Sequence, residues 1–172
     1  MTDKTPDALS ADGLTSEQLA SDLESDLERA RAAIFEHSRE LPFFKLIGLE
    51  ILEMEPGRSK VRIQWRPDLC QPAQIIHGGI VATLIDTGIA HALLLTPAYL
   101  HSEDSSLVSV DLRVKFLRPV SEGTIVCEST IPRLGKQIIH AESVVTNAEG
   151  KEVARGDSIY MVVKRDRLRR GG

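Results

Sequence analysis

The sequence predicts an α+β domain in which an antiparallel sheet is wrapped around one long central helix, with an extra helix before it. Residues 77–95 are the first observation behind this prediction, because they are apolar on nearly every side of a helix, as in a helix buried all round. Residues 107–163 are the second. Their alternating apolar and polar positions, interrupted by turn residues, predict only strands.

Composition and charge are typical of a single globular domain. The chain has 172 residues, of which 42% are hydrophobic and 27% charged, and its formal net charge of -4 gives no overall basic field for a nucleic acid. No apolar run approaches the length of a membrane span, and residues 1–13 lack the apolar core of a signal peptide. A cytoplasmic location is the default expectation, with Cys70 and Cys127 as free thiols that lack metal-ligand spacing.

A helix is expected before the main domain. It begins at Thr15 or Ser16, with Gln18 as a capping-box partner of Thr15, and Leu41-Pro42 ends it. The sequence leaves the role of this helix open. The chain therefore divides into a disordered N-terminus (1–14), a helical extension (15–40), a main domain (41–164) and a basic, frayed tail (165–172).

Six strands are expected in the main domain, two before the central helix and four after it. Pro56-Gly57 marks the first turn, and Leu134-Gly135-Lys136 marks a hairpin turn. A loop at 67–76 leads into the central helix. The expected strands cover residues 48–54, 60–66, 108–116, 124–132, 137–146 and 152–164.

The central helix carries one carboxylate, Asp86, in an otherwise apolar stretch. A carboxylate there is costly unless it is paired, hydrogen-bonded or used in a reaction. Gly78 and Gly79 lie at the N-terminus of the helix, where backbone N–H groups and the dipole favour negative charge such as an oxyanion.

Asp86 and the two glycines are too far apart on one helix to act easily on one carbonyl group. Asp86 lies about 13 Å along the axis from His77 and about half a turn round it. Two antiparallel copies related by a two-fold axis would bring the two ends together, so a catalytic Asp86 predicts a dimer.

Asp86 also has a purely structural interpretation, in which its carboxylate is hydrogen-bonded to Thr83 or Thr87. The helix alone leaves both interpretations open. His91, five residues further on, is interpreted as a satisfied polar residue rather than as a catalyst.

Several features of the chain together match one known family. They are His77-Gly78-Gly79 with Asp86 nine residues after the histidine, the order of the elements, and Val108-Ser109-Val110-Asp111-Leu112 after the helix. In these features the sequence resembles the hotdog-fold acyl-CoA thioesterases, and most closely the phenylacetyl-CoA thioesterase (PaaI-type) branch, over about residues 40–164. The resemblance implies a hotdog fold, an acyl-CoA substrate and a homo-oligomer, at least a dimer and often a dimer of dimers, with the site between two subunits.

The resemblance implies a role for each matching residue. Asp86 corresponds to the acidic residue that acts on the thioester as general base or as nucleophile, and the sequence leaves that choice open. Gly78 and Gly79 correspond to the glycines of which one donates its N–H to the thioester oxygen. His77 corresponds to a histidine that orients the thioester or the loop, and Ser109 to a hydroxyl that helps to hold the attacking water.

Two residues of the loop before the helix depart from the family pattern. Gln71 stands six residues before the histidine, where relatives usually have the shorter amide Asn, and is assigned to substrate binding. Gln74 stands three residues before the histidine, where relatives often have Gly.

A second group is assigned to the CoA phosphates, because it offers positive charge or the N–H groups of a hairpin turn. Basic side chains on a strand or in a turn are more often simply solvated, so that interpretation stays open as well. The group consists of Arg113, Lys115, Gly135 and Lys136.

His77 and Ser109 also have plain structural interpretations. His77 is a suitable cap for the helix N-terminus. Ser109 lies, by strand alternation, on the face opposite Val110 and Leu112, where it would be exposed to solvent.

Hydrolysis of an acyl-CoA to a free acid and CoA is therefore the expected function, and no metal or cofactor is implied. The main alternative is a non-catalytic acyl-CoA-binding protein of the same fold. A second alternative is a hydroxyacyl thioester dehydratase, which needs a histidine–acid pair such as His77 and Asp86 across a dimer. The sequence does not identify the acyl group or distinguish a dimer from a tetramer.

Overall fold

The computed structural model describes residues 15–100, 102, 104–135 and 138–169. Its helices are α1 (Ser16–Glu40), α2 (Pro42–Ile47), the 3-10 turn η1 (Pro67–Leu69), α3 (Gly78–Leu94), α4 (Pro97–Leu100) and α5 (Arg165–Arg169). Its strands are β1 (Leu49–Glu55), β2 (Arg58–Gln64), β3 (Ser105–Phe116), β4 (Thr124–Leu134), β5 (Ile139–Asn147) and β6 (Glu152–Lys164).

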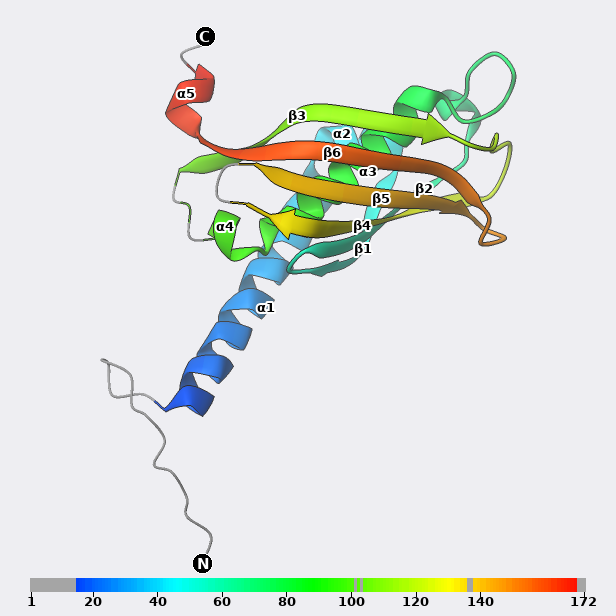
Figure 1. Cartoon of the computed structure of the whole chain (residues 1–172). Coiled ribbons are helices and arrows are strands. Elements are labelled where there is room, and N and C mark those ends of the chain that lie inside the picture. The colour runs from blue at the N-terminus through cyan, green and yellow to red at the C-terminus, as the bar shows by residue number, and fades with distance from the viewer. Residues whose placement is uncertain (1–14, 101, 103, 136–137, 170–172) are drawn as a thin grey trace, which may run out of the picture.

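The six strands form one antiparallel sheet in the order β1-β2-β4-β5-β6-β3. Figure 1 shows the sheet curving over α3, with α1 projecting away from it. The expected α+β class is confirmed, as are the six strands and the central helix between the second and third of them. The division of the chain into four segments stays a prediction, and its first segment, residues 1–14, lies outside the described residues.

Helix α3 packs closely on the sheet because its core-facing side chains are aliphatic and glycines allow the approach. A Cβ on Gly88 would lie 2.6 Å from Ser129 Oγ, and a Cβ on Gly156 of β6 would lie 2.6 Å from Ile85 Cγ2. Each buried aliphatic side chain contributes about 1.5–3 kcal/mol relative to an exposed one. Five side chains of α3 have no exposed surface: Leu84, Ile85, Ile89, Ala92 and Leu93.

Strand β3 contains a β-bulge that inverts the side-chain alternation predicted from the sequence. Ser109 pairs with Tyr160 of β6, and Asp111 pairs with the preceding residue Ile159, so Val110 is the extra residue of the bulge. Ser109 therefore faces α3 together with Leu112, which packs on the core. The predicted solvent-facing position of Ser109 is wrong for this reason.

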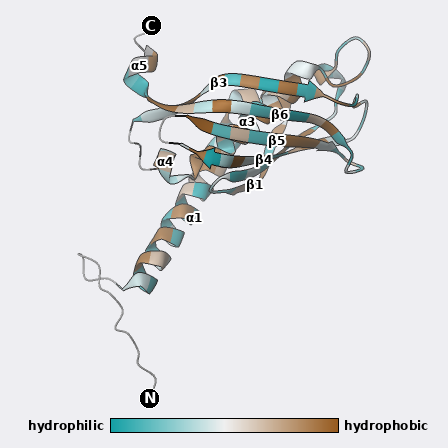
Figure 2. Ribbon diagram, in the orientation of Figure 1, coloured by the Kyte–Doolittle hydropathy of each residue, from teal (hydrophilic) through white to brown (hydrophobic). Residues whose placement is uncertain are grey.

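The N-terminal helix α1 starts with the expected capping box. The Thr15 side chain accepts from the Gln18 N–H, and Gln18 Oε1 accepts from the Thr15 N–H. The C-terminal part of α1 packs on the domain, where Ser38 is buried. Its first turns project beyond the sheet, and hydrophobic and hydrophilic positions alternate along α1 in Figure 2. Leu19 and Leu23 in these turns have exposed side chains.

The C-terminal residues differ from the sequence prediction. Residues Arg165–Arg169 form the short helix α5, where a frayed tail was expected. The Arg165 side chain donates from Nε to the backbone O of Ser105, at the start of β3. This contact ties the end of the chain to the edge of the sheet.

Candidate active site

Asp86 is half-buried in α3, and a side chain from the sheet binds its carboxylate. Tyr160 of β6 donates its hydroxyl to Asp86 Oδ1 at 2.6 Å, and the same hydroxyl lies 2.9 Å from the backbone O of Asp86. Neither Thr83 nor Thr87 bonds this carboxylate within the described residues. The hydrogen-bond partner of Asp86 is thus Tyr160 rather than either of the threonines considered from the sequence.

Ser109 lies in the same polar cluster. Its hydroxyl is 3.2 Å from that of Ser158, which donates to the backbone O of Asp111 at 2.6 Å. Ser109 also contacts the Tyr160 hydroxyl. The structure therefore brings Ser109 and Asp86 together through Tyr160, in one chain.

The two glycines at the N-terminus of α3 differ in the hydrogen bonding of their N–H groups. His77 is the N-cap, and its Nδ1 accepts a hydrogen bond from the Gly79 N–H at 2.9 Å. This confirms the capping interpretation of His77 and uses the Gly79 donor. The Gly78 N–H has no acceptor among the described residues, so Gly78 is the donor that remains for a ligand.

A pocket of about 400 Å³ lies beside Gly78. Gln71 lines it from the loop before α3, and Phe116 lines it from the end of β3. A Cβ on Gly78 would lie 3.2 Å from Phe116 Cζ, so any other residue there would require the Phe116 ring to shift. The remaining lining is mostly aliphatic: Ile75, Ile76, Val81, Leu117, Arg118, Pro119, Val120 and Val153.

The loop that leads into α3 is held by backbone hydrogen bonds. The Ile76 N–H donates to the backbone O of Val120 at 2.8 Å, and the His77 N–H donates to that of Leu69 at 2.9 Å. Gln74 has a φ of +61°, the left-handed conformation that favours glycine. This explains in physical terms why a glycine suits the position that Gln74 occupies.

Gly78 and Asp86 of one chain do not share a cleft. Eight residues separate them, which places them about 12 Å apart along the helix axis. The pocket at Gly78 has Gln71 and Phe116 in its wall but not Asp86, Tyr160 or Ser109. The pocket at Gly78 and the polar cluster around Asp86 are therefore two separate features of each chain.

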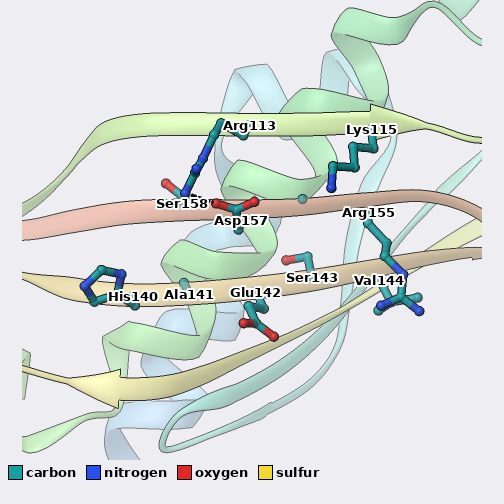
Figure 3. A pocket seen from close by; sticks show the side chains of 11 residues that line it. Arg113, Lys115, His140, Ala141, Glu142, Ser143, Val144, Arg155, Asp157 and Ser158 are labelled. Carbon is teal, nitrogen blue, oxygen red and sulfur yellow. Dashed lines mark ion pairs between the residues drawn. The ribbon is translucent and has the colours of Figure 1, made fainter.

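Arg113 and Lys115, assigned to the CoA phosphates, lie on the outer face of the sheet. Figure 3 shows them around a hollow of about 360 Å³ that Arg155 and Asp157 of β6 also line. Arg113 forms an ion pair with Asp157. The bulge turns these side chains away from α3, so the sheet separates them from Asp86 of the same chain.

The hairpin assigned to the phosphates is described only in part. Gly135 directly follows β4, whose last residue, Leu134, pairs with Ile139 of β5. Ile139 in turn pairs with Tyr160 of β6. Lys136 lies outside the described residues. The role of this turn stays a prediction.

His91 has a polar contact at each ring nitrogen, and the two cysteines form no disulfide. The ring of His91 donates from Nδ1 to the backbone O of Thr87 at 2.7 Å, and its Nε2 lies 3.3 Å from Ser38 Oγ. Its interpretation as a satisfied polar residue is confirmed. Cys70 and Cys127 are free thiols, as expected.

Metal-ligand clusters and membrane-spanning helices are the two remaining features to describe. No cluster of three metal-ligating side chains occurs in the described part of the chain. None of the described helices is both long and apolar enough to cross a membrane.

Sequence reasoning missed Tyr160. In β6 it shares the inward face with Ala154, Gly156 and Ser158, all buried. These small residues indicate that β6 approaches the helix closely. A larger polar residue on the same face, Tyr160, could therefore have been predicted to reach Asp86. The two residues are 74 positions apart in the sequence and form no motif.

Sequence comparisons relate this chain to known esterases and thioesterases. The model of the thioesterase superfamily matches residues 73–154. A predicted esterase of Halobacterium salinarum is 31% identical over 150 residues, which cover 82% of this chain and 97% of that protein. The medium/long-chain acyl-CoA thioesterase YigI of Salmonella typhimurium is 26% identical over 133 residues, which cover 71% of this chain and 86% of that protein.

Solved structures show the same fold. The PaaI protein from the phenylacetic acid degradation operon of E. coli superposes with a TM-score of 0.68 at 23% identity, over 82% of this chain and 96% of that one. The expected hotdog fold is thereby confirmed. With an HGG-capped central helix inside a six-stranded sheet, and a near full-length relative above 30% identity, this chain belongs to the thioesterase superfamily.

Proposed function

We propose that this protein hydrolyses acyl-CoA thioesters to a free acid and CoA, in a dimer that assembles each site from two chains. The observation that carries the proposal is the Gly78 N–H, which has no acceptor among the described residues and lies at a helix N-terminus beside an apolar pocket. Such a donor suits the oxygen of a thioester, which becomes an oxyanion when the carbonyl carbon is attacked. One well-placed donor contributes about 2.7–4 kcal/mol to the stability of that transition state.

Asp86 of the partner subunit supplies the second half of the site. It takes a proton from a water that attacks the carbonyl carbon, or attacks that carbon itself and forms an anhydride that water then cleaves. In both cases the C–S bond breaks and CoA leaves as the thiolate, which takes up a proton. General-base assistance of this kind contributes about 10²–10⁴-fold to the rate.

The free edge of β3 supports the dimer. It is a 12-residue strand at the end of the sheet order, and Val110 and Phe116 on it are each 58% exposed. A long edge strand pairs readily with a second chain. Pairing there would place Ser109 and Tyr160, which lie beside this edge, close to the two-fold axis.

The pocket at Gly78 suits the hydrocarbon part of the acyl group. Its wall is mostly aliphatic, with Gln71 as an amide near the reacting carbonyl and Arg118 as the one cation. One relative, the Salmonella typhimurium protein that is 26% identical over 133 residues, is named a medium/long-chain acyl-CoA thioesterase. We expect aliphatic acyl-CoA substrates to be cleaved, with Arg113 and Lys115 reserved for the phosphates of a CoA bound on another face of the assembly.

The test is a panel of acyl-CoA substrates with release of free CoA followed by a thiol reagent. Wild-type protein should cleave at least one acyl length, and Asp86→Asn should lower kcat by about 100-fold or more while keeping its fold, because the Asn oxygen can still accept from Tyr160. Asp22→Asn, at an exposed position of α1, is the matched control and should turn over normally.

Three results would contradict the proposal. Wild-type turnover by Asp86→Asn excludes this residue from the chemistry. Tight CoA binding with no cleavage of any substrate favours the non-catalytic alternative. Hydration of crotonyl-CoA would favour the dehydratase, although the bond from Gly79 to His77 already engages the histidine that reaction needs.

A further inference from the structure

We propose that Tyr160 is a positioning residue for Asp86, holding one carboxylate oxygen so that the other is free to act on water or on the thioester. This rests on the proposed function, since Asp86 is the reacting group there. The proposal depends on the position of the Tyr160 hydroxyl, which lies 2.6 Å from Asp86 Oδ1 and 2.9 Å from the backbone O of Asp86.

The shorter contact has the length of a hydrogen bond to an ionised oxygen. Charge-assisted O–H···O⁻ bonds measure about 2.5–2.7 Å and are roughly twice as strong as neutral ones. A hydroxyl has one proton, and the geometry directs it to Oδ1. Oδ2 has no partner among the described residues, which leaves it available to a proton or to a carbonyl carbon.

Tyr160 is itself held rigidly by the sheet. It pairs with Ile139 of β5 on one side and with Ser109 of β3 on the other, and it is 3% exposed. A ring packed in this way cannot redirect its hydroxyl, whereas a free Asp side chain turns about two torsions. The sheet thus determines where the carboxylate points, and an error of about 1 Å in such a position costs about 100-fold in rate.

The chemistry of Tyr160 suits a permanent donor. Burial, and then the hydrogen bond and negative charge of Asp86, raise the pKa of Tyr160 above its ordinary value, while the contact with Ser109 acts in the opposite direction. The hydroxyl therefore keeps its proton through the neutral range. A hydrogen bond to the ionised form of a carboxylate favours that form, which a base and a nucleophile both require.

The other buried titratable groups beside α3 are engaged elsewhere. His91 bonds the backbone O of Thr87 and Ser38, and Cys127 of β4 lies 3.6 Å from the hydroxyl of Ser129. Tyr160 is the titratable side chain that bonds Asp86 in the described structure.

A merely structural role makes different predictions. If Tyr160 only ties β6 to α3 through the backbone O of Asp86, its loss lowers stability and nothing else. If it positions the carboxylate, its loss changes the reaction in protein that remains folded.

The first experiment compares two identical chemical changes. Tyr160→Phe removes the hydroxyl at the site, and Tyr99→Phe does the same at the other of the two tyrosines of the chain, on α4. We expect Tyr160→Phe to lower kcat about tenfold or more and to leave KM within about twofold. Tyr99→Phe should match the wild type. A lower melting temperature with a wild-type kcat overturns the proposal, as does no change at all.

The second experiment needs no substrate. A ¹³C NMR spectrum at pH 7 follows the Asp86 carboxyl, assigned with Asp86→Asn, in the wild type and in Tyr160→Phe. The chemical shift of the carboxyl carbon should differ between the two proteins, because the hydrogen bond to Oδ1 is lost in the variant, and coincident chemical shifts overturn the proposal. If the wild type cleaves no acyl-CoA, the proposed function fails while this spectrum still decides the role of Tyr160.

A third measurement covers the case in which Tyr160→Phe does not fold. In the Tyr99→Phe background Tyr160 is the single tyrosine, so its ultraviolet absorbance at high pH reports its ionisation. Adding Asp86→Asn should make that ionisation occur at lower pH, because a negative charge has been removed. An unchanged titration would mean that the two groups do not interact, and the proposal would be wrong.

Discussion

Gln74 occupies a backbone conformation that costs free energy for any residue other than glycine. Its φ is +61°, and its side chain is exposed, with no hydrogen bond in the described structure. A left-handed conformation costs an L-residue about 1–2 kcal/mol. Glycine avoids this cost but loses about 0.5–1 kcal/mol more backbone entropy on folding. Gln74→Gly should therefore stabilise the protein by about 0.5–1 kcal/mol.

Thermal unfolding followed by circular dichroism measures this effect. In a protein of 150–250 residues 1 kcal/mol corresponds to about 2–4 °C in Tm, so Gln74→Gly should raise Tm by about 1–4 °C. The backbone bond from the Gln74 N–H to the backbone O of Gln71 at 2.9 Å is kept in the variant. A denaturant titration should show the same increase with an unchanged slope.

Two neighbouring variants separate strain from flexibility. Gln74→Ala keeps the left-handed residue and should leave Tm within about 1 °C. Ala73→Gly adds flexibility where φ is not positive, and should lower stability by about 0.5–1 kcal/mol. If Gln74→Gly lowers Tm as Ala73→Gly does, then Gln74 carries no strain and the reasoning is refuted.

Three further predictions concern charge and reactivity. Lys115→Ala should raise KM for an acyl-CoA about two- to fivefold, and an equal rise for an acyl-pantetheine, which lacks the nucleotide, would show that Lys115 does not meet the phosphates. Burial lowers the pKa of His91, so the unfolded chain binds its proton more readily and stability falls as the pH drops below about 6.5. His91→Gln should flatten that dependence in urea titrations between pH 7 and 5, whereas the exposed His37→Gln should not. Burial raises the pKa of the Cys127 thiol to about 11, so mass spectrometry after alkylation of native protein should find the label on Cys70 and none on Cys127 until the protein unfolds.

The central helix could be predicted because its signals are local. The apolar run of α3 and the interval between Gly78 and Asp86 depend only on helical geometry. The six strands could also be located along the chain, since turns and alternation mark each strand separately. Their order in the sheet, with β3 paired to β6, was not predicted. The capping role of His77 was among the open interpretations for the same reason, because a cap bonds residues close to itself in sequence.

What alternation could not predict is the orientation of β3. It placed Ser109 on the same face as Arg113 and Lys115, and the bulge at Val110 puts them on opposite faces instead. A bulge is one extra residue in a pairing register, and register is a property of two strands. The bond between Tyr160 and Asp86 was missed for a related reason, since it depends on how closely β6 approaches α3.

The bulge also explains how one edge strand can serve two faces of the sheet. Without an extra residue, every second side chain of β3 would lie on the same face, and Ser109 could not join Tyr160 while Arg113 faces the outer hollow. Because a strand shifted by one residue turns all its side chains over, the bulge fixes the register at the point where Ser109 reaches Tyr160. The same strand lies at the end of the sheet order. If the proposed dimer pairs at this edge, its assembly and the placement of Ser109 beside Asp86 both depend on one local irregularity, and sequence changes in β3 would affect the two together.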